Sequence, residues 1–507
     1  MSSTADLRGV ARGGALNLVG AGVTTLVTLG TTLAIARALS KTGAGTFFAA
    51  TSLFLLVESL VVSGATTGLV YFIARGRAVG RFADVRRSLR VSFVPVLVAS
   101  VIVAASTPLW APAFAQVLSG TPTSTGTGLV LLMCALPLAA TSDMALAATT
   151  GYRTMRPTVF VERIGRPLLQ LILVLAVLPR HDPVALALAW VAPYFISFIV
   201  AVVWLRRMVE KDDTRQAAGE PSNTGERLTL RTFWTYTAPR GVASVAQTAM
   251  QRLDIVLVGV LADAKAAALY TVATRFLVVG QLLAAAIATS VQPRLAGWFA
   301  LGDSAAVRRH YQVATGWVVL IAWPFYLACA WLAPYWLELF GRRYNQATGV
   351  VVVLAGSMLL ATGCGMVSVV LVMAGRTFDN LLNTVVALVV NIGLDVLLIP
   401  HLGIMGAAIG WAAAITANNL MPLAQVGFRL HMHPFGRATL LAGGVSAVCL
   451  GLVPLLTRLI IGPSLAGVLS GCVIGSALWL LAAVRYRNVL ELQAFRPGRP
   501  VGAVAQP

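Results

Sequence analysis

Charged and amide side chains recur inside apolar stretches of the sequence, where they could bind a polar ligand. In residues 240–254 the polar side chains fall within about 80° of one another on a helix, because successive residues are separated by about 100°. This stripe comprises Arg240, Ser244, Gln247, Gln251 and Asp254. At a rise of 1.5 Å per residue, the stripe is about 21 Å long, which is most of the depth of a bilayer core. Lipid does not tolerate such a face, so we expect it to line water or a ligand path.

Two further arginines are predicted to lie near the middle of a membrane. Arg252 falls off the stripe, and Arg275 lies in the next apolar stretch. An arginine at that depth costs at least about 2.5 kcal/mol, so each should have a compensating partner. Two compatible interpretations follow. One is a buried ion pair with Glu58, Asp143 or Asp254. The other is a water-filled cavity in which Arg240, Arg252 or Arg275 binds an anionic ligand.

Other polar residues also lie deep in apolar stretches. Asn380, Thr384, Asn391 and Asp395 form a second polar face within about 60° of the helix circumference. Its residues could hydrogen-bond between helices, for about 0.6 kcal/mol each, or contact a ligand. Glu58 and Asp143 are candidates for ion coupling or for ion pairing, as are Asp254 and Asp395. Glu162, Arg163 and Arg166 begin a further stretch, and we expect them at its cytoplasmic mouth. There they belong to the positive-inside signal or form a first docking point for phosphate.

The composition requires a membrane to house these residues. The chain has 507 residues, a mean hydropathy of +0.83 and only 11% charged residues. Apolar stretches of about 20 residues recur, each long enough to cross a bilayer as a helix. We predict an all-α polytopic membrane protein with about fourteen spans. These are 14–36, 43–70, 91–116, 127–150, 159–179, 184–205, 232–262, 266–291, 311–337, 347–373, 378–400, 404–428, 438–457 and 464–484.

The net charge of +20 is mostly a topology signal. Most of the 38 Lys and Arg fall in alternate loops or at the termini, so we expect both termini in the cytoplasm and no nucleic-acid partner. Membrane lipids are the expected secondary partners of these charges. The sequence contains no Walker A, dinucleotide-binding or HExxH motif. We therefore predict a protein that is not an enzyme and that uses no cofactor and no metal.

An internal repeat predicts two lobes. "ALSKTGAGTFFAATSLFLL" (38–56) resembles "VLADAKAAALYTVATRFLV" (260–278), and Pro179–Trp190 has the same spacing as Pro400–Trp411. Six spans per half is an even number, so the halves should be related by a pseudo-two-fold axis along the membrane normal. The predicted division is an N-terminal lobe (1–205), a flexible cytoplasmic linker (206–231), a C-terminal lobe (232–430), and two added spans with a cytoplasmic tail (431–507).

The residues then suggest a family. The spans, the repeat and "QRLDIVLVGVLADAKAAALYTVATRF" resemble the polysaccharide transporters of the multidrug/oligosaccharidyl-lipid/polysaccharide (MOP) exporter superfamily. Arg252, Asp254, Gly259 and Tyr270 match its second-half hairpin. The resemblance implies a flippase in the bacterial plasma membrane that moves a polyprenyl-diphosphate-linked oligosaccharide to the outer leaflet. It implies partners such as a glycan polymerase and glycosyltransferases. Arg240, Arg252 and Arg275 would then bind the diphosphate, and Gln247, Gln251 and Asn391 the sugars.

Two relatives within the superfamily offer alternatives. Peptidoglycan-precursor (lipid II) flippases share an arginine that Arg275 would match, but their arginines on the first two spans have no counterpart here. Multidrug antiporters usually have an acid on the first span, which is absent, although Asp254 and Asp395 could form a cation site. A membrane scaffold with no transport activity is a third alternative.

Overall fold

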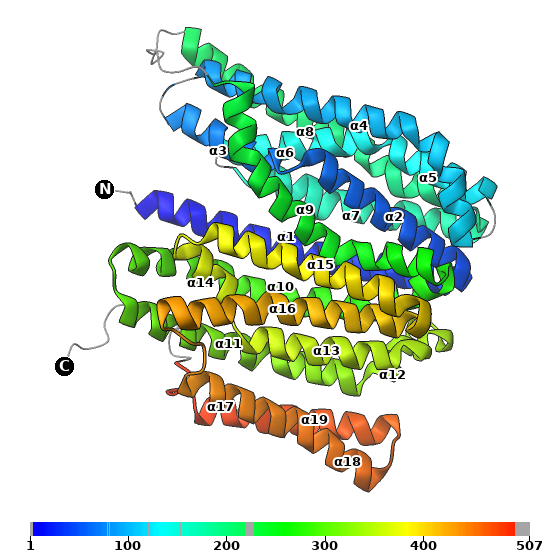
Figure 1. Cartoon of the computed structure of the whole chain (residues 1–507), viewed down its shortest axis with the longest axis vertical. Coiled ribbons are helices and arrows are strands. Elements are labelled where there is room, and N and C mark those ends of the chain that lie inside the picture. Colours follow the sequence, from blue (N-terminus) through cyan, green and yellow to red (C-terminus); the bar gives the residue numbers. More distant parts are fainter. Residues whose placement is uncertain are drawn as a thin grey trace. The chain divides into compact units, whose positions relative to one another are not determined.

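The computed structural model describes residues 4–78, 80, 82–119, 122–152, 154–217 and 228–491, and nearly all of them are helical (Figure 1). The α-helices are α1 (Thr4–Ala38), α2 (Lys41–Val62), α3 (Ala65–Ala78), α4 (Phe82–Ser119), α5 (Pro122–Cys134), α6 (Leu136–Gly151), α7 (Arg166–Val177), α8 (Pro183–Ala217), α9 (Leu230–Leu261), α10 (Ala264–Ala300), α11 (Ser304–Trp331), α12 (Ala333–Glu338), α13 (Thr348–Gly363), α14 (Val367–Met373), α15 (Thr377–Leu402), α16 (Ile404–Leu430), α17 (Arg437–Ser446), α18 (Val453–Ile461) and α19 (Leu465–Arg485). Two π-helices, η1 (Thr158–Gly165) and η4 (Ala447–Leu452), and two 3₁₀ segments, η2 (Leu178–Arg180) and η3 (Arg342–Ala347), complete the described elements.

The chain is an all-α, multi-pass membrane protein, as predicted. Twelve helical segments of the described residues are long and apolar enough to cross a bilayer. The expected count of about fourteen is therefore not confirmed. The two remaining expected spans are nevertheless helical, as η1 with α7 and as α9. Helix α9 contains Arg231, Arg240, Arg252 and Asp254, which lower its apolar character.

Two expected spans are interrupted where the backbone adopts positive φ. The span predicted at 43–70 ends as α2 at Val62, and α3 starts at Ala65 after Ser63 (φ 42°) and Gly64 (φ 71°). The span predicted at 347–373 is divided into α13 and α14 around Gly365 (φ 69°). Glycine adopts this left-handed conformation at little cost, so it terminates a helix in a membrane segment that hydropathy alone makes continuous.

The chain forms two compact units. Unit 1 comprises Met1–Val272 and Asp395–Ala407, and unit 2 comprises Ala273–Leu394 and Ala408–Pro507. In unit 1, α9 packs against α2 and α3, α4 packs against α5, and α6 packs against α3 and α8. Leu69, Ile73, Met144 and Phe233 are among the buried residues of its core. The predicted lobe boundaries remain a prediction. Helix α8 continues to Ala217, inside the expected linker, and 218–227 lies outside the described residues.

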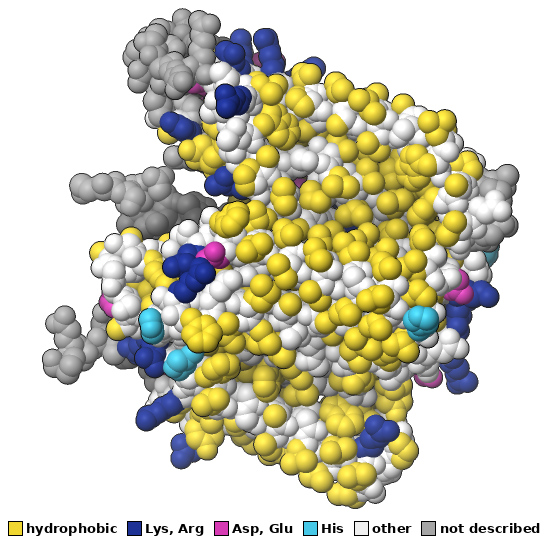
Figure 2. Space-filling view, viewed as in Figure 1, with side chains coloured by type: hydrophobic (Ala, Val, Ile, Leu, Met, Phe, Trp, Pro, Cys, Tyr) yellow, Lys and Arg dark blue, Asp and Glu magenta, His cyan; other side chains and the backbone are white. Residues whose placement is uncertain are grey.

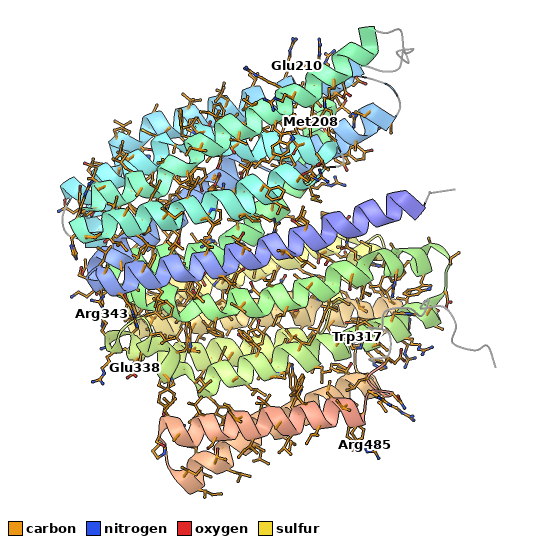
Figure 3. The ribbon with its side chains drawn as sticks, turned by 180° about the vertical axis from the view of Figure 1, so that it is seen from behind. Met208, Glu210, Trp317, Glu338, Arg343 and Arg485 are labelled. Atoms are coloured by element: carbon orange, nitrogen blue, oxygen red, sulfur yellow. The ribbon has the colours of Figure 1, made fainter. Side chains whose placement is uncertain are left out.

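In unit 2, α11 packs against α13 and α17, and α18 packs against α19. The indole of Trp317 donates a 2.8 Å hydrogen bond to the carbonyl of Leu490, which joins α11 to the segment after α19. Glu338 and Arg343 lie at one end of these helices and Arg485 at the other (Figure 3). The polar loops therefore mark the ends of long apolar helices.

The surfaces of the helices match a lipid environment. Along the visible face the side chains are mostly hydrophobic, and Lys and Arg gather toward the helix ends (Figure 2). Large apolar side chains are exposed on several helices, among them Ile102, Leu109, Leu397 and Ile460. An exposed apolar surface of this extent is satisfied by lipid rather than by water.

Candidate functional site

A cavity of about 840 Å³ lies within unit 1, between α3, α6, η1 and α9. Its polar lining consists of Tyr71 and Arg75 from α3, Asp143 from α6, Glu162 from η1 and Tyr236 from α9, together with four threonine hydroxyls. Ligand sites in proteins typically occupy about 300–1,000 Å³. The cavity is therefore large enough to hold a substantial polar ligand among helices that are otherwise apolar on their outer faces.

A close backbone contact places α9 against α3 at this cavity. A Cβ atom on Gly64 would lie 2.6 Å from the Cα of Gly241. The two backbone segments are therefore in contact at the junction between α2 and α3. One turn of α9 earlier, the ring of Tyr236 stacks on that of Tyr71, with centroids 4.3 Å apart and planes at 21°. The glycine contact permits this stacking, because larger side chains would hold the helices apart.

Arg240 extends this aromatic pair. Its guanidinium carbon lies 3.9 Å from the centroid of the Tyr236 ring, a cation–π contact. Its Nη1 also donates a 2.8 Å hydrogen bond to the carbonyl of Tyr236. The side chain is exposed, so part of its donor capacity remains available to a ligand.

One wall of the cavity is rich in carboxyl groups. Asp143 forms an ion pair with Arg166, with Oδ1 and Nη1 3.6 Å apart. The guanidinium of Arg166 also lies 4.7 Å from the ring centroid of the buried Tyr194. Behind this wall, Glu58 is 7% exposed and interacts electrostatically with Asp143, Arg166 and Glu162. Within the described part of the chain, its Oε1 has no hydrogen-bond partner.

The π-helix η1 presents Glu162 to the cavity. Its wider turns run from Thr158 to Gly165, and both Thr158 and Glu162 line the pocket. Arg166 begins α7 immediately afterwards and points to Asp143. Segments of π-helix are rare in proteins, and those that occur are often found at functional sites. The sequence led us to expect Glu162 and Arg166 at the cytoplasmic mouth. The structure makes Arg166 the ion-pair partner of Asp143, and the position at the cytoplasmic mouth stays a prediction.

The predicted stripe on α9 is exposed along most of its length. Arg240, Ser244, Gln247 and Gln251 are exposed, as their helical spacing requires for a shared face. Arg252 lies off this stripe and is half-buried. Its side chain has no hydrogen bond or ion pair to another described residue. None of Arg240, Arg252 and Arg275 lines the cavity. Arg275 is a half-buried residue of α10 in unit 2.

Asp254 belongs to a buried carboxyl pair. Its Oδ2 accepts a 2.8 Å hydrogen bond from the hydroxyl of Tyr270. Its carboxyl group is also hydrogen-bonded to that of Asp395, which is fully buried. Two adjacent carboxyl groups of this kind need a shared proton or a cation. Asn391 is also fully buried, on α15. No described group of three His, Cys, Asp or Glu residues has a metal-binding arrangement.

Sequence reasoning missed Tyr71, Arg75 and Tyr236. The signal was present in α3, where Thr67, Tyr71 and Arg75 are spaced four residues apart and therefore share a face. We predicted no ligand role for this face, because Arg75 lies in a basic loop region that already had a topological explanation. Tyr236 became recognisable only through its stacking on Tyr71.

Two family models and one curated relative match parts of this sequence. The family model "Polysaccharide biosynthesis protein" matches residues 10–298, and the model "MatE" matches residues 239–398. A curated relative, the probable low-salt glycan biosynthesis flippase Agl15 of Haloferax volcanii, is 22% identical over 199 residues, 38% of this chain. The match spans only 41% of the length of that relative.

Solved structures show the same fold. The structure titled lipid II flippase MurJ, inward closed conformation, has a TM-score of 0.70 at 14% identity, over 93% of this chain and 99% of the other. An inward-facing MATE transporter of the MOP superfamily has a TM-score of 0.67 at 13% identity, over 81% of this chain and 95% of the other. Because the polysaccharide family model matches more than half of the chain, the chain belongs to the polysaccharide biosynthesis protein family.

Proposed function

We propose that the protein flips a polyprenyl-diphosphate-linked oligosaccharide from the inner to the outer leaflet of a bacterial plasma membrane by alternating access, for surface polysaccharide synthesis. Both termini would lie in the cytoplasm. The observation that supports this most is the cavity of unit 1, which offers aromatic rings, hydroxyls and charges inside a membrane protein of the polysaccharide family. Sugars need such polar groups, while the polyprenyl tail can remain in lipid.

Arginines would bind the diphosphate. Arg75 lines the cavity and is exposed at the C-terminal end of α3, and Arg240 is exposed on α9. Arg252 and Arg275 remain candidates from the sequence. Guanidinium groups bind phosphate through charge-assisted, often bidentate hydrogen bonds. The exposed Gln247 and Gln251 would contact sugars as the carrier moves, and Asn391 remains a further candidate for that role.

The arginine hypothesis is tested by export in cells. We expect Arg240→Ala and Arg275→Ala each to lower the export of surface glycan about tenfold, since a hydrogen bond to a charged group contributes about 1.5–3 kcal/mol. Surface glycan would be measured by lectin binding at matched protein levels in the membrane. Arg342→Ala, at an exposed residue of the 3₁₀ segment η3, is the matched control. Wild-type export by both test variants would remove the arginine hypothesis.

The carboxyl pair is our candidate for ion coupling. Asp254 and Asp395 are buried side by side with the Tyr270 hydroxyl, so they could hold a proton or a monovalent cation. Glu58 and Asp143 are second candidates. We expect Asp254→Asn to slow transport several-fold and to weaken its dependence on an imposed ion gradient in proteoliposomes. If Asp254→Asn keeps the wild-type dependence on the gradient, the pair is only structural.

Two alternative substrates have specific support. The MurJ-like fold favours lipid II, and the MatE match over 239–398 favours a cation-coupled drug antiporter. A strain lacking this protein distinguishes the three. Loss of surface glycan with unchanged sensitivity to cationic dyes and intact peptidoglycan supports the proposed substrate. Cell lysis with lipid II accumulation, or increased dye sensitivity, supports one of the alternatives. A glycan polymerase and glycosyltransferases are the expected functional partners.

A further inference from the structure

We propose that the cavity of unit 1 is the subsite for the sugars, and that Asp143 and Glu162 make it selective for neutral or amine-bearing sugars over carboxylated ones. This inference rests on the proposed function and names the class of sugar that the carrier would present. It assigns the diphosphate to the rim of the cavity rather than to its interior.

The aromatic pair supports a sugar ligand. Tyr71 is 38% exposed and lines the cavity, and one face of its ring stacks on Tyr236. An exposed ring held flat by a second ring presents an apolar platform with a phenolic hydroxyl at its edge. Pyranose rings have one apolar face and several hydroxyls, so they suit such a platform. Hydroxyls of Thr66, Thr67, Thr150 and Thr158 also line the cavity and can both donate and accept hydrogen bonds.

The charges are sorted by position. Glu162 and Asp143 are partly buried in the wall, whereas Arg75 is exposed at the end of α3. The guanidinium of Arg166 is already paired with Asp143 and packed on Tyr194. Glu58 adds a third carboxyl group behind the wall, with a buried Oε1 that has no hydrogen-bond partner among the described residues. Three carboxyl groups thus interact with the guanidinium of Arg166. Arg75, which has no ion pair to another described residue, lies at the exposed end of α3.

This sorting determines which ligands fit. Carboxylates accept hydrogen bonds from sugar hydroxyls and attract an ammonium group, but they repel another carboxylate at short range, where the low dielectric strengthens the repulsion. A diphosphate would meet the same repulsion in the interior and would instead meet Arg75 at the rim. The geometry therefore points to a bound carrier with its sugar inside and its diphosphate at the exposed end of α3.

The test measures binding by purified full-length protein in nanodiscs. The probes are three phytanyl diphosphates with the same lipid, bearing glucose, glucosamine or glucuronic acid, and a fourth with no sugar. We expect the glucose and glucosamine probes to bind at least tenfold more tightly than the glucuronic acid probe. We expect Glu162→Gln to reduce that preference about tenfold while retaining glucose binding, which also demonstrates that the variant is folded.

Two further variants complete the design. Tyr71→Ala should weaken binding of all three sugar probes several-fold without changing that of the sugar-free probe. Glu338→Gln is the matched acid-to-amide control, at an exposed residue of unit 2, and should change nothing.

The outcomes separate the two proposals. If the sugar probes bind with equal affinity, or if Glu162→Gln leaves the preference unchanged, the sugar subsite is overturned while the proposed function stands. If none of the four diphosphates binds, the proposed function fails, and the sugar subsite fails with it.

Discussion

Arg166 supplies the counter-charge for Asp143 and Glu162 in the cavity wall and for Glu58 behind it. Its guanidinium lies 3.6 Å from Asp143 and packs on Tyr194, and only 16% of its side chain is exposed. Positive charge at this position reduces the electrostatic cost of placing Asp143 and Glu58 among apolar helices. The residue therefore contributes to folding as well as to the shape of the cavity.

Removing Arg166 should destabilise the protein. We expect Arg166→Leu to lower the free energy of unfolding by about 3 kcal/mol, because breaking a buried ion pair leaves an uncompensated charge. Thermal unfolding in detergent, followed by fluorescence, measures the effect. The double variant Asp143→Asn with Arg166→Leu should recover part of the loss. Arg180→Leu, at an exposed residue, is the control. An unchanged melting temperature for Arg166→Leu would contradict this account of the wall.

At the scale of elements, the junction of α2 and α3 fixes the position of α9. Gly241 lies so close to the backbone of Ser63 that a Cβ atom there would overlap the carbonyl oxygen. This contact lies next to the stacked Tyr71 and Tyr236, so the cavity depends on two helices approaching without side chains between them.

A matched pair of glycine substitutions tests this dependence. Gly241→Ala should destabilise the protein by about 1–3 kcal/mol, since overpacking forces the helices apart. Gly393→Ala places the same methyl group on α15, where nothing lies within 4 Å, and should be neutral or stabilising by up to about 1 kcal/mol. Thermal unfolding of both variants measures the difference between their effects on stability. Equal effects would show that the close contact has no energetic role.

The sequence predicted the helices better than their interruptions. Hydropathy identifies an apolar stretch such as 43–70, because the cost of exposing backbone groups to lipid is a local property. Hydropathy does not register the break at Ser63–Gly64, because that break depends on backbone conformation and not on apolarity. The polar stripe from Arg240 to Gln251 was predictable from a single periodicity. The cavity combines side chains of α3, α6, η1 and α9, and neither Tyr71 nor Tyr236 could be assigned to it in advance.

At the scale of the whole molecule, the distribution of basic residues predicts the orientation of the chain. Met208 and Glu210 lie near the end of α8 (Figure 3). Lys211 follows them in the sequence, in a region expected to face the cytoplasm. Glu338, by contrast, lies at a helix end that the predicted topology places outside the cell. The two ends of the helices should therefore differ in access from outside the cell.

Cysteine labelling tests this orientation. In a background lacking the five native cysteines, Glu338→Cys should react with a membrane-impermeant maleimide in intact cells. Lys211→Cys should react only after permeabilisation. Gel-shift labelling with and without permeabilisation gives the result directly. Reaction of the Lys211→Cys variant in intact cells would place that loop outside and reverse the predicted topology.

The π-helical turns of η1 give this segment an unusual tolerance of a one-residue deletion. A helix that hydrogen-bonds from i to i+5 holds more residues per turn than an α-helix. Deleting one residue between Thr158 and Gly165 would let α-helical winding resume, so Arg166 would keep roughly its orientation toward Asp143. The same deletion within the regular helix α7 would instead rotate every residue beyond it by about 100°. Loss of a single codon in η1 should therefore leave the direction of the helix that follows nearly unchanged.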